Sequence, residues 1–258
     1  MIPKIIHACW LGKAEMPADQ KAYVEGWHRL LPDYEIILWT DETFQKYYDD
    51  SLFVKEAIKR KKYGFLADYF RFTVLYEFGG IYMDTDVELL RRPDEFLNCK
   101  MFMGYIFDSS IGTAVIGTEK HNPLMLEWRD ILERDFEEKG EFTVSNDWVT
   151  AYFLRHFPDF RLTGDRQSLA AGIELYPKDY FERYRVNKKS GGGYAEHHCA
   201  GSWSDAGVPL YKRILKKLLP RSVISRLGHR QVLPKTAHYQ TYRAHKRMKK
   251  AEERGAKA

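Results

Sequence analysis

The sequence predicts an α/β fold in which a mixed central sheet is covered by helices on both faces. Two observations lead to this expectation: short apolar runs alternate with longer segments of helical periodicity, and glycine or proline separates many of them. The length of 258 residues is sufficient for one large domain with a sizeable core. We therefore expect a single globular body.

The N-terminal part is expected to alternate strands with helices. Pro17 suits the first turn of a helix, and Thr40 followed by Asp41 predicts the capped start of a short helix. Apolar runs predict strands, and apolar residues at helical spacing predict helices. The pattern gives strands over residues 4–10 and 35–39, and helices over residues 17–31 and 51–61.

The middle of the chain holds the most informative pattern. Apolar residues recur at helical spacing over residues 65–78, and Gly79 and Gly80 supply the positive φ that ends this helix. Residues 81–83 follow as a short buried strand, because they are apolar and too few for a helix. Further along, the sequence predicts strands near residues 100–105 and 113–117, and helices over residues 121–138 and 145–157.

Two carboxylates, Asp84 and Asp86, stand at the carboxyl end of the strand over residues 81–83. Ligands bind at that end of open α/β sheets, and oxygen ligands suit Mg²⁺ or Mn²⁺, whose shell phosphates can complete. An isolated D-x-D is more often a polar turn. Asp68 and Arg71, three residues apart on the preceding helix, share one face, either as a simple ion pair or as part of a binding site.

The string from Ala67 to Asp86 resembles the sugar-binding region of the D-x-D glycosyltransferases of family 32. That family includes yeast-type α-mannosyltransferases, bacterial capsule and lipopolysaccharide sugar transferases and, more distantly, large glucosylating toxins. The resemblance implies a Rossmann-like nucleotide-sugar transferase domain of the GT-A type that uses Mn²⁺ or Mg²⁺ and retains the anomeric configuration. It also implies that Asp86 binds the metal ion directly, that Asp84 shares the metal or binds the ribose, and that Asp68 and Arg71 hold hydroxyls of the donor sugar.

The opening segment, residues 2–12, resembles the first strand of the same family. The resemblance implies that Trp10 packs on the nucleotide base, where stacking is worth about 1–3 kcal/mol in nucleic-acid systems. The alternative is that Trp10 is simply part of the core. His7 is expected to be a structural histidine within the strand.

Residues 197–203 resemble the C-terminal H-x-x-x-S-W motif of the family. The resemblance implies that His198 completes the metal shell and that Ser202 and Trp203 hold the diphosphate. His197 is adjacent, so the choice between the two histidines stays open. The glycine-rich residues 190–193 are expected to act as the hinge of a lid over the donor.

Asn146 and Asp147 stand at the expected helix start at residue 145, and the resemblance implies that they lie near the reacting carbon. Asp147 is the nucleophile candidate if the reaction passes through a covalent intermediate, and front-face attack is the other route to retention. Asp147 can equally be an ordinary residue of a helix N-terminus.

Charge is divided unevenly along the chain. Residues 210–258 hold 15 lysines and arginines but 2 acidic residues, a net charge of +13, whereas residues 1–209 carry −8. We therefore expect a transferase domain over residues 1–209 and a basic tail over residues 210–258. An amphipathic helix over residues 211–219 would place this tail on an anionic membrane surface; a solvated tail, or a helix packed on the acidic body, is the alternative.

The absence of a signal-like start and the three scattered cysteines favour a reducing, cytoplasmic location. The basic tail then predicts a peripheral position at the inner face of the cell membrane. The expected function is transfer of a sugar from a UDP- or GDP-sugar to a glycan or lipid-linked glycan in cell-surface polysaccharide synthesis. A metal-dependent phosphohydrolase is one alternative. A nucleic-acid-binding module is a weaker one, because the body is acidic and has no reader motif, so no nucleic-acid partner is expected.

Overall fold

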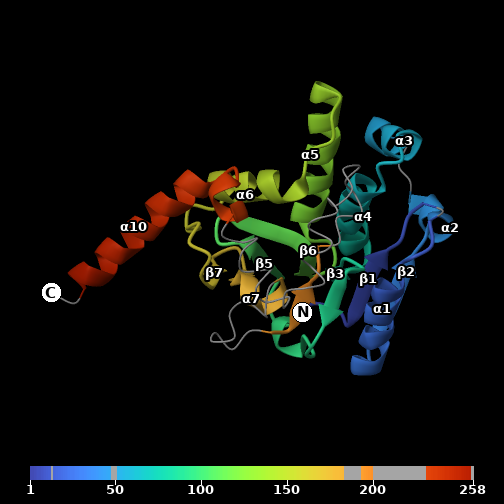
Figure 1. Ribbon diagram of the computed structural model, residues 1–258, viewed down its shortest axis with the longest axis horizontal. Helices are drawn as coiled ribbons and strands as arrows, with labels where there is room; N and C mark the ends of the chain where they lie inside the picture. Colours follow the sequence, from blue (N-terminus) through green and yellow to red (C-terminus); the bar gives the residue numbers. More distant parts are fainter. Residues whose placement is uncertain (13, 48–50, 183–192, 200–230, 257–258) are drawn as a thin grey trace.

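A seven-stranded mixed sheet forms the centre of the computed structural model, which describes residues 1–12, 14–47, 51–182, 193–199 and 231–256 (Figure 1). Its strand order is β2-β1-β3-β6-β5-β8-β7, and β4 pairs with β9 in a separate two-stranded sheet. The strands are β1 Ile5–Cys9, β2 Glu35–Trp39, β3 Gly80–Met83, β4 Val87–Leu89, β5 Met101–Phe107, β6 Ser110–Thr118, β7 Gln167–Leu169, β8 Ile173–Tyr176 and β9 Ala195–His197.

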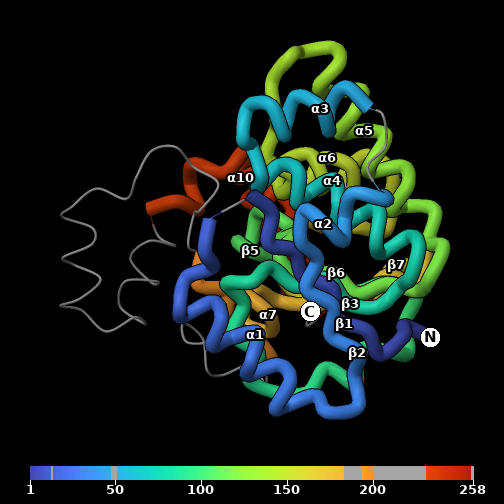
Figure 2. The backbone as a smooth tube through the Cα atoms, turned by 90° about the vertical axis from the view of Figure 1, so that its right-hand side faces the viewer, coloured from blue at the N-terminus to red at the C-terminus, as the bar shows by residue number. Residues whose placement is uncertain are grey.

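Helices cover both faces of the seven-stranded sheet, as predicted (Figure 1 and Figure 2). The helices are α1 Ala18–Leu30, α2 Asp41–Phe44, η1 Gln45–Tyr47, α3 Leu52–Lys59, α4 Tyr63–Phe78, η2 Asp94–Phe96, α5 Pro123–Lys139, α6 Ser145–His156, α7 Lys178–Phe181, η4 Leu233–Lys235 and α10 Tyr239–Gly255. In β3, Tyr82 packs into the core beneath α3, α4 and α5, whereas Ile81 and Met83 pack into the core that includes α1. This alternation places a hydrophobic core on each side of the sheet and confirms the predicted α/β class with a mixed sheet.

The parallel strands β1, β2 and β3 bring the predicted site residues to one edge of the sheet. β1 lies between the other two in parallel register, with His7 opposite Ile37 and Tyr82. The carboxyl ends of parallel strands meet at the same edge, so Trp10, after β1, and Asp84, after β3, lie on the same side of the sheet.

Two glycines make the tight connection from α4 into β3, as predicted. Gly79 has a φ of 66° and Gly80 a φ of 97°. A side chain on Gly79 would place its Cβ 2.6 Å from the backbone nitrogen of Lys120, and one on Gly80 would place its Cβ 2.6 Å from the carbonyl oxygen of Ile5. Both the backbone conformation and the close packing therefore require glycine.

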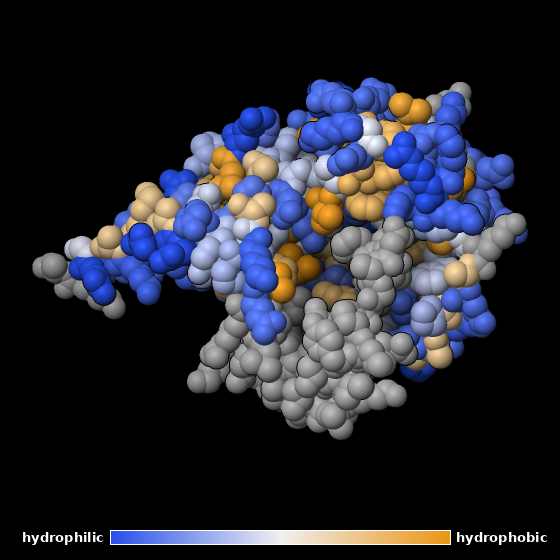
Figure 3. Space-filling view, turned by 45° about the horizontal axis from the view of Figure 1, so that its top comes forward, coloured by the Kyte–Doolittle hydropathy of each residue, from blue (hydrophilic) through white to orange (hydrophobic). Residues whose placement is uncertain are grey.

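Residues 231–256, from the predicted tail, form η4 and α10 and contact the body. Ser109 hydrogen-bonds to Thr236, and His245 Nδ1 accepts a hydrogen bond from the backbone nitrogen of Leu162 at 2.9 Å. Lys246 and Lys249 both pair with Asp165. The far end of α10 projects from the body (Figure 1), and its surface carries hydrophilic side chains together with some apolar ones (Figure 3).

The predicted helix over residues 211–219 and the boundary between residues 209 and 210 lie outside the described residues. Within the described part of the chain, no helix is both long and apolar enough to cross a membrane.

Candidate functional site

A cavity of about 470 Å³ opens at the carboxyl edge of β1 and β3. Trp10 contributes to its wall after β1, α4 contributes Asp68 and Arg71, and the turn after β3 contributes Asp84 and Asp86. The cavity therefore gathers all five of these predicted site residues, although they span 77 positions of the sequence.

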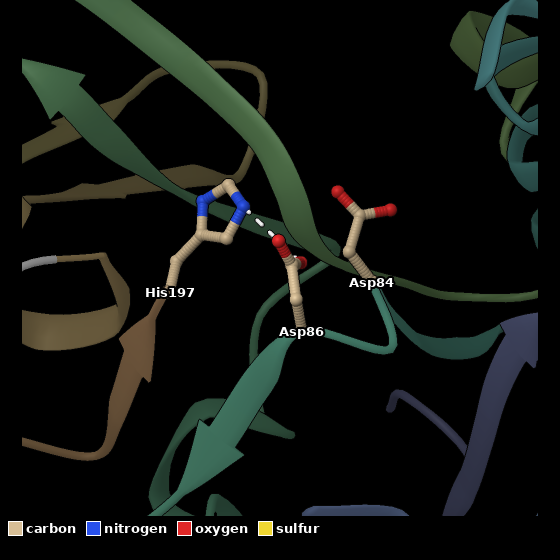
Figure 4. A group of neighbouring side chains, drawn as sticks. All are labelled: Asp84, Asp86 and His197. Carbon is tan, nitrogen blue, oxygen red and sulfur yellow. Dashed lines mark ion pairs between the residues drawn. The ribbon is translucent and has the colours of Figure 1, made fainter. Parts of the chain in front are cut away.

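Asp84, Asp86 and His197 form a candidate metal site within this cavity (Figure 4). One ligand atom from each residue lies within 4.8 Å of the others, and His197 Nε2 is 3.3 Å from Asp86 Oδ1. Burial, and to a smaller extent the charge of Asp86, raises the pKa of Asp84 to about 6 against the opposing effect of Arg71. Two neighbouring carboxylates and an imidazole suit a divalent cation such as Mn²⁺ or Mg²⁺, because the cation relieves the repulsion between the two acids.

The structure corrects the predicted role of His198, because its side chain is directed away from the two aspartates. It stacks on Tyr23 with ring centroids 4.6 Å apart, and its Nε2 is 3.0 Å from Oε2 of Glu88. Neighbouring residues of an extended segment point to opposite sides. Since β9 pairs with β4, it is His197 that faces Asp86.

Glu182 lies directly behind His197 and was not predicted from the sequence. Its carboxylate oxygen Oε2 is 2.5 Å from His197 Nδ1, and its side chain is 2% exposed. It follows α7, a helix of four residues that carries no long periodic pattern. Neither a motif nor a spacing marks this glutamate, so the sequence contains no signal for its position.

Asp68 and Arg71 pair on one face of α4, as the spacing predicts. Arg71 Nη2 lies 2.9 Å from Asp68 Oδ1, and both side chains are almost fully buried. Burial raises the pKa of Asp68, while the positive charge of Arg71 opposes this rise. The guanidinium also lies over the ring of Tyr82, 4.6 Å from its centroid. Because the pair borders the cavity instead of facing bulk solvent, it is more than a surface ion pair.

Trp10 is half-buried at the cavity wall and not enclosed in the core. Its Nε1 donates a hydrogen bond to the carbonyl oxygen of Ala14 at 2.7 Å, which orients the indole. Its partly open position agrees with the predicted stacking role. His7, by contrast, is fully buried within β1 and contacts only structural groups among those described, as expected for a structural histidine.

Asn146 borders the cavity, but Asp147 does not. Asn146 Oδ1 accepts hydrogen bonds from the backbone nitrogen and the hydroxyl of Thr113, at 3.0 and 2.9 Å, which attach the start of α6 to β6. Asp147 is one residue further along the helix, hence rotated by about 100°, and is exposed. Asp147 therefore does not border the cavity in which the other predicted residues meet, and its place in the first turn of α6 is the ordinary one for an acid.

The predicted diphosphate-binding residues Ser202 and Trp203, and residues 190–192 of the predicted lid hinge, lie outside the described residues. Their roles stay predictions. Cys199 borders the cavity, and all three cysteines are free thiols.

Comparison with known proteins agrees with this geometry. Residues 17–102 match the family model described as the glycosyltransferase sugar-binding region containing the DXD motif. The chain is 34% identical over 128 residues to inositol phosphoceramide mannosyltransferase 3 of Schizosaccharomyces pombe, covering 49% of this chain and 36% of that protein. It is 27% identical over 230 residues to inositol phosphoceramide mannosyltransferase 2 of the same yeast, covering 82% of this chain and 61% of that protein.

The solved structure of the PaToxG glycosyltransferase is also similar, with a TM-score of 0.47, 17% identity and coverage of 54% of this chain and 62% of that one. The predicted resemblance to the D-x-D glycosyltransferases is confirmed over residues 17–102, which match their sugar-binding region. This chain spans about a third to three fifths of the length of these two yeast relatives.

Proposed function

We propose that this protein is a metal-dependent glycosyltransferase that moves a sugar from a nucleotide-diphosphate donor to a glycan or lipid-linked acceptor. The main support for the proposal is that Asp84, Asp86 and His197 lie close together in the cavity. The buried pair of Asp68 and Arg71 lines the same cavity. The yeast relatives are named as mannosyltransferases of a lipid with an inositol phosphate headgroup, so a GDP-linked mannose is the first donor to test. UDP-sugars are the second.

In this proposal each group of residues has a separate task. Asp84, Asp86 and His197 would hold Mn²⁺ or Mg²⁺, which neutralises charge on the diphosphate leaving group. Asp68 and Arg71 orient the sugar, and Trp10 supports the base. We further propose that the reaction retains the anomeric configuration, as the resemblance implies. Since Asp147 is exposed away from the cavity, front-face attack is the route favoured here.

The experiment is turnover of a panel of GDP- and UDP-sugars with Mn²⁺, with and without a lipid-linked acceptor. We expect release of nucleoside diphosphate with the sugar on the acceptor, loss of turnover in EDTA, and loss in Asp86→Asn. Asp147→Asn is the matched control, because it removes a nearby carboxylate outside the cavity. Release of nucleoside monophosphate and sugar phosphate would show the alternative function, a phosphohydrolase, because that enzyme breaks the diphosphate and leaves the glycosidic bond intact.

We also propose that the protein acts at an anionic membrane surface on the cytoplasmic side, for instance in capsule or lipopolysaccharide synthesis. The supporting observation is a stripe of exposed basic residues on α10, at intervals of four, three and four residues: Arg243, Arg247, Lys250 and Arg254. This spacing keeps all four cations on one side of the helix. Lys246 and Lys249 instead pair with Asp165 of the body. One side of α10 therefore contacts the body, while the four basic residues are exposed to solvent.

A further inference from the structure

We infer that Glu182 is a positioning residue for metal binding: it fixes the ring of His197 so that Nε2 faces Asp84 and Asp86. The inference rests on the proposed metal site and assigns a task to a residue outside it. It is carried by the contact between Glu182 and His197 and by the way the sheet makes room for Glu182.

The contact determines which ring nitrogen of His197 is available. Oε2 of Glu182 is 2.5 Å from Nδ1, on the opposite side of the ring from Nε2, which is 3.3 Å from Asp86 Oδ1. A carboxylate can only accept, so Nδ1 carries the hydrogen. In the neutral imidazole, Nε2 is then left with its lone pair directed at the aspartates. The other ring nitrogen of a metal-ligating histidine generally donates to a carboxylate, a backbone carbonyl or a water, and this contact fixes the tautomer and the orientation of the ring.

The backbone reinforces this arrangement. The nitrogen of His197 donates a hydrogen bond to the carbonyl oxygen of Glu182 at 3.1 Å, so the two residues are connected through main chain as well as side chains. β9 in turn pairs with β4, with His197 opposite Val87. Because β4 begins one residue after Asp86, the same short sheet sets the distance between His197 and Asp86.

Two facing glycines leave the space that Glu182 occupies. Gly104 of β5 pairs with Gly112 of β6. A Cβ on Gly112 would lie 2.3 Å from Oε1 of Glu182, and one on Gly104 would lie 3.0 Å from Cδ2 of Phe181. Because the two glycines have no side chains, the end of α7 packs directly on the backbone of the sheet. This packing brings the carboxylate of Glu182 to the cavity. A methyl group at position 112 would push that carboxylate out of place.

The neighbouring pair of His198 and Glu88 provides a matched control. It has the same chemistry, with Nε2 of His198 3.0 Å from Oε2 of Glu88, but it is directed away from the aspartates. An effect specific to Glu182 cannot then be ascribed to the loss of any histidine–glutamate contact in this part of the fold.

The test measures Mn²⁺ affinity of the full chain by calorimetry, so it does not depend on turnover. Glu182→Met, which removes the acceptor, should raise the Kd for Mn²⁺ about 10–100-fold. Glu182→Gln, which keeps the shape and one acceptor, should raise it less, and Gly112→Ala should also raise it. Glu88→Gln should leave it unchanged. Pulsed electron paramagnetic resonance should show nitrogen coupling to Mn²⁺ that disappears in His197→Ala and persists in His198→Ala.

A double-mutant cycle separates positioning from a general structural effect. In the His197→Ala background, Glu182→Gln should have no further effect on Mn²⁺ affinity, because the ring it orients is gone. If Glu182→Met does not fold, the Gln variant alone decides. Wild-type Mn²⁺ affinity in Glu182→Gln, or an equal loss with and without His197, would overturn the inference. Absence of Mn²⁺ binding by the unmodified protein would instead refute the proposed metal site itself.

Discussion

Arg71 donates a hydrogen bond from Nη2 to Oδ1 of Asp84 at 3.1 Å, joining α4 to the turn after β3. The same Nη2 atom lies 2.9 Å from Asp68 Oδ1, so one guanidinium connects the predicted sugar-binding acid with the proposed metal site. Nη1 donates to the carbonyl oxygen of Thr113, which fixes the group against β6. Arg71 is therefore held on three sides, and removing it would leave the buried Asp68 and the partly buried Asp84 without their cation, at a cost of about 3–5 kcal/mol.

Asp68 is a better position than Arg71 at which to test donor binding. Asp68→Asn keeps the side-chain shape, and Arg71 retains Asp84 as its partner. If Asp68 holds a sugar hydroxyl, the variant should weaken binding of the intact nucleotide-sugar by about 2 kcal/mol and leave binding of the nucleoside diphosphate almost unchanged. Calorimetry with both ligands in Mn²⁺ measures the difference. Equal weakening of the two ligands would contradict a role in sugar binding.

Trp10 is expected to support the base of the donor. Trp10→Ala should weaken binding of the nucleoside diphosphate by about 1–3 kcal/mol, and Trp10→Phe by less, because a smaller ring still stacks. The same Trp10→Ala change should leave Mn²⁺ affinity in the absence of nucleotide unaltered. Nucleotide binding that is equally strong in all three proteins would show that Trp10 does not contact the base.

His7 should make folding stability depend on pH. Trp39 Nε1 donates to its Nδ1 at 3.2 Å, so Nε2 carries the hydrogen and donates to the carbonyl oxygen of Gly79 at 2.9 Å. Burial lowers the pKa of His7 to about 4, although the hydrogen bond to Gly79 opposes the shift. The unfolded chain, with the ordinary value of 6.5, then binds more protons than the folded chain between pH 6.5 and pH 4.

The contribution of His7 to the free energy of unfolding should therefore be complete above pH 6.5. It should fall as the pH decreases towards 4, by roughly 3 kcal/mol in total. Other carboxyl groups titrate in the same range, so the informative quantity is the difference between the unmodified protein and His7→Gln, which does not titrate. Urea unfolding at intervals between pH 4 and pH 7.5 gives the free energy of unfolding at each pH, and this free energy should change less with pH in the variant. The same pH dependence in both proteins would show that His7 is not the residue responsible.

The basic stripe of α10 should bind anionic vesicles. Each basic residue near such a surface is worth about 1 kcal/mol, so replacing Arg243, Arg247, Lys250 and Arg254 by glutamine should reduce co-sedimentation with phosphatidylserine vesicles strongly. Lys246→Gln together with Lys249→Gln is the control, because these two lysines already pair with Asp165. Binding should decrease with salt. Equal pelleting of the stripe variant and the unmodified protein would exclude α10 as the contact surface.

Local patterns in the sequence were sufficient to predict the helix and the strand that precede the D-x-D motif. The helical spacing before Gly79, the two glycines and the apolar run after them predict α4 and β3 to within two residues, because each feature depends on near neighbours alone. The start of α5 follows similarly from Asn122, whose side chain accepts a hydrogen bond from the nitrogen of Leu124, and from the proline between them. Asp84 and Asp86 follow directly from the end of β3.

The tertiary structure alone decided which residues complete the site. The H-x-x-x-S-W spacing points to His198, but the pairing of β9 with β4 turns the adjacent His197 towards Asp86. Glu182 reaches His197 because two glycines, eight residues apart in the sequence, face each other across β5 and β6. Such contacts depend on strand register and on space between elements, which no local pattern encodes. The sequence by itself therefore identified the two aspartates of the proposed metal site. The tertiary structure decided that His197 lies beside them and that Glu182 lies behind this histidine.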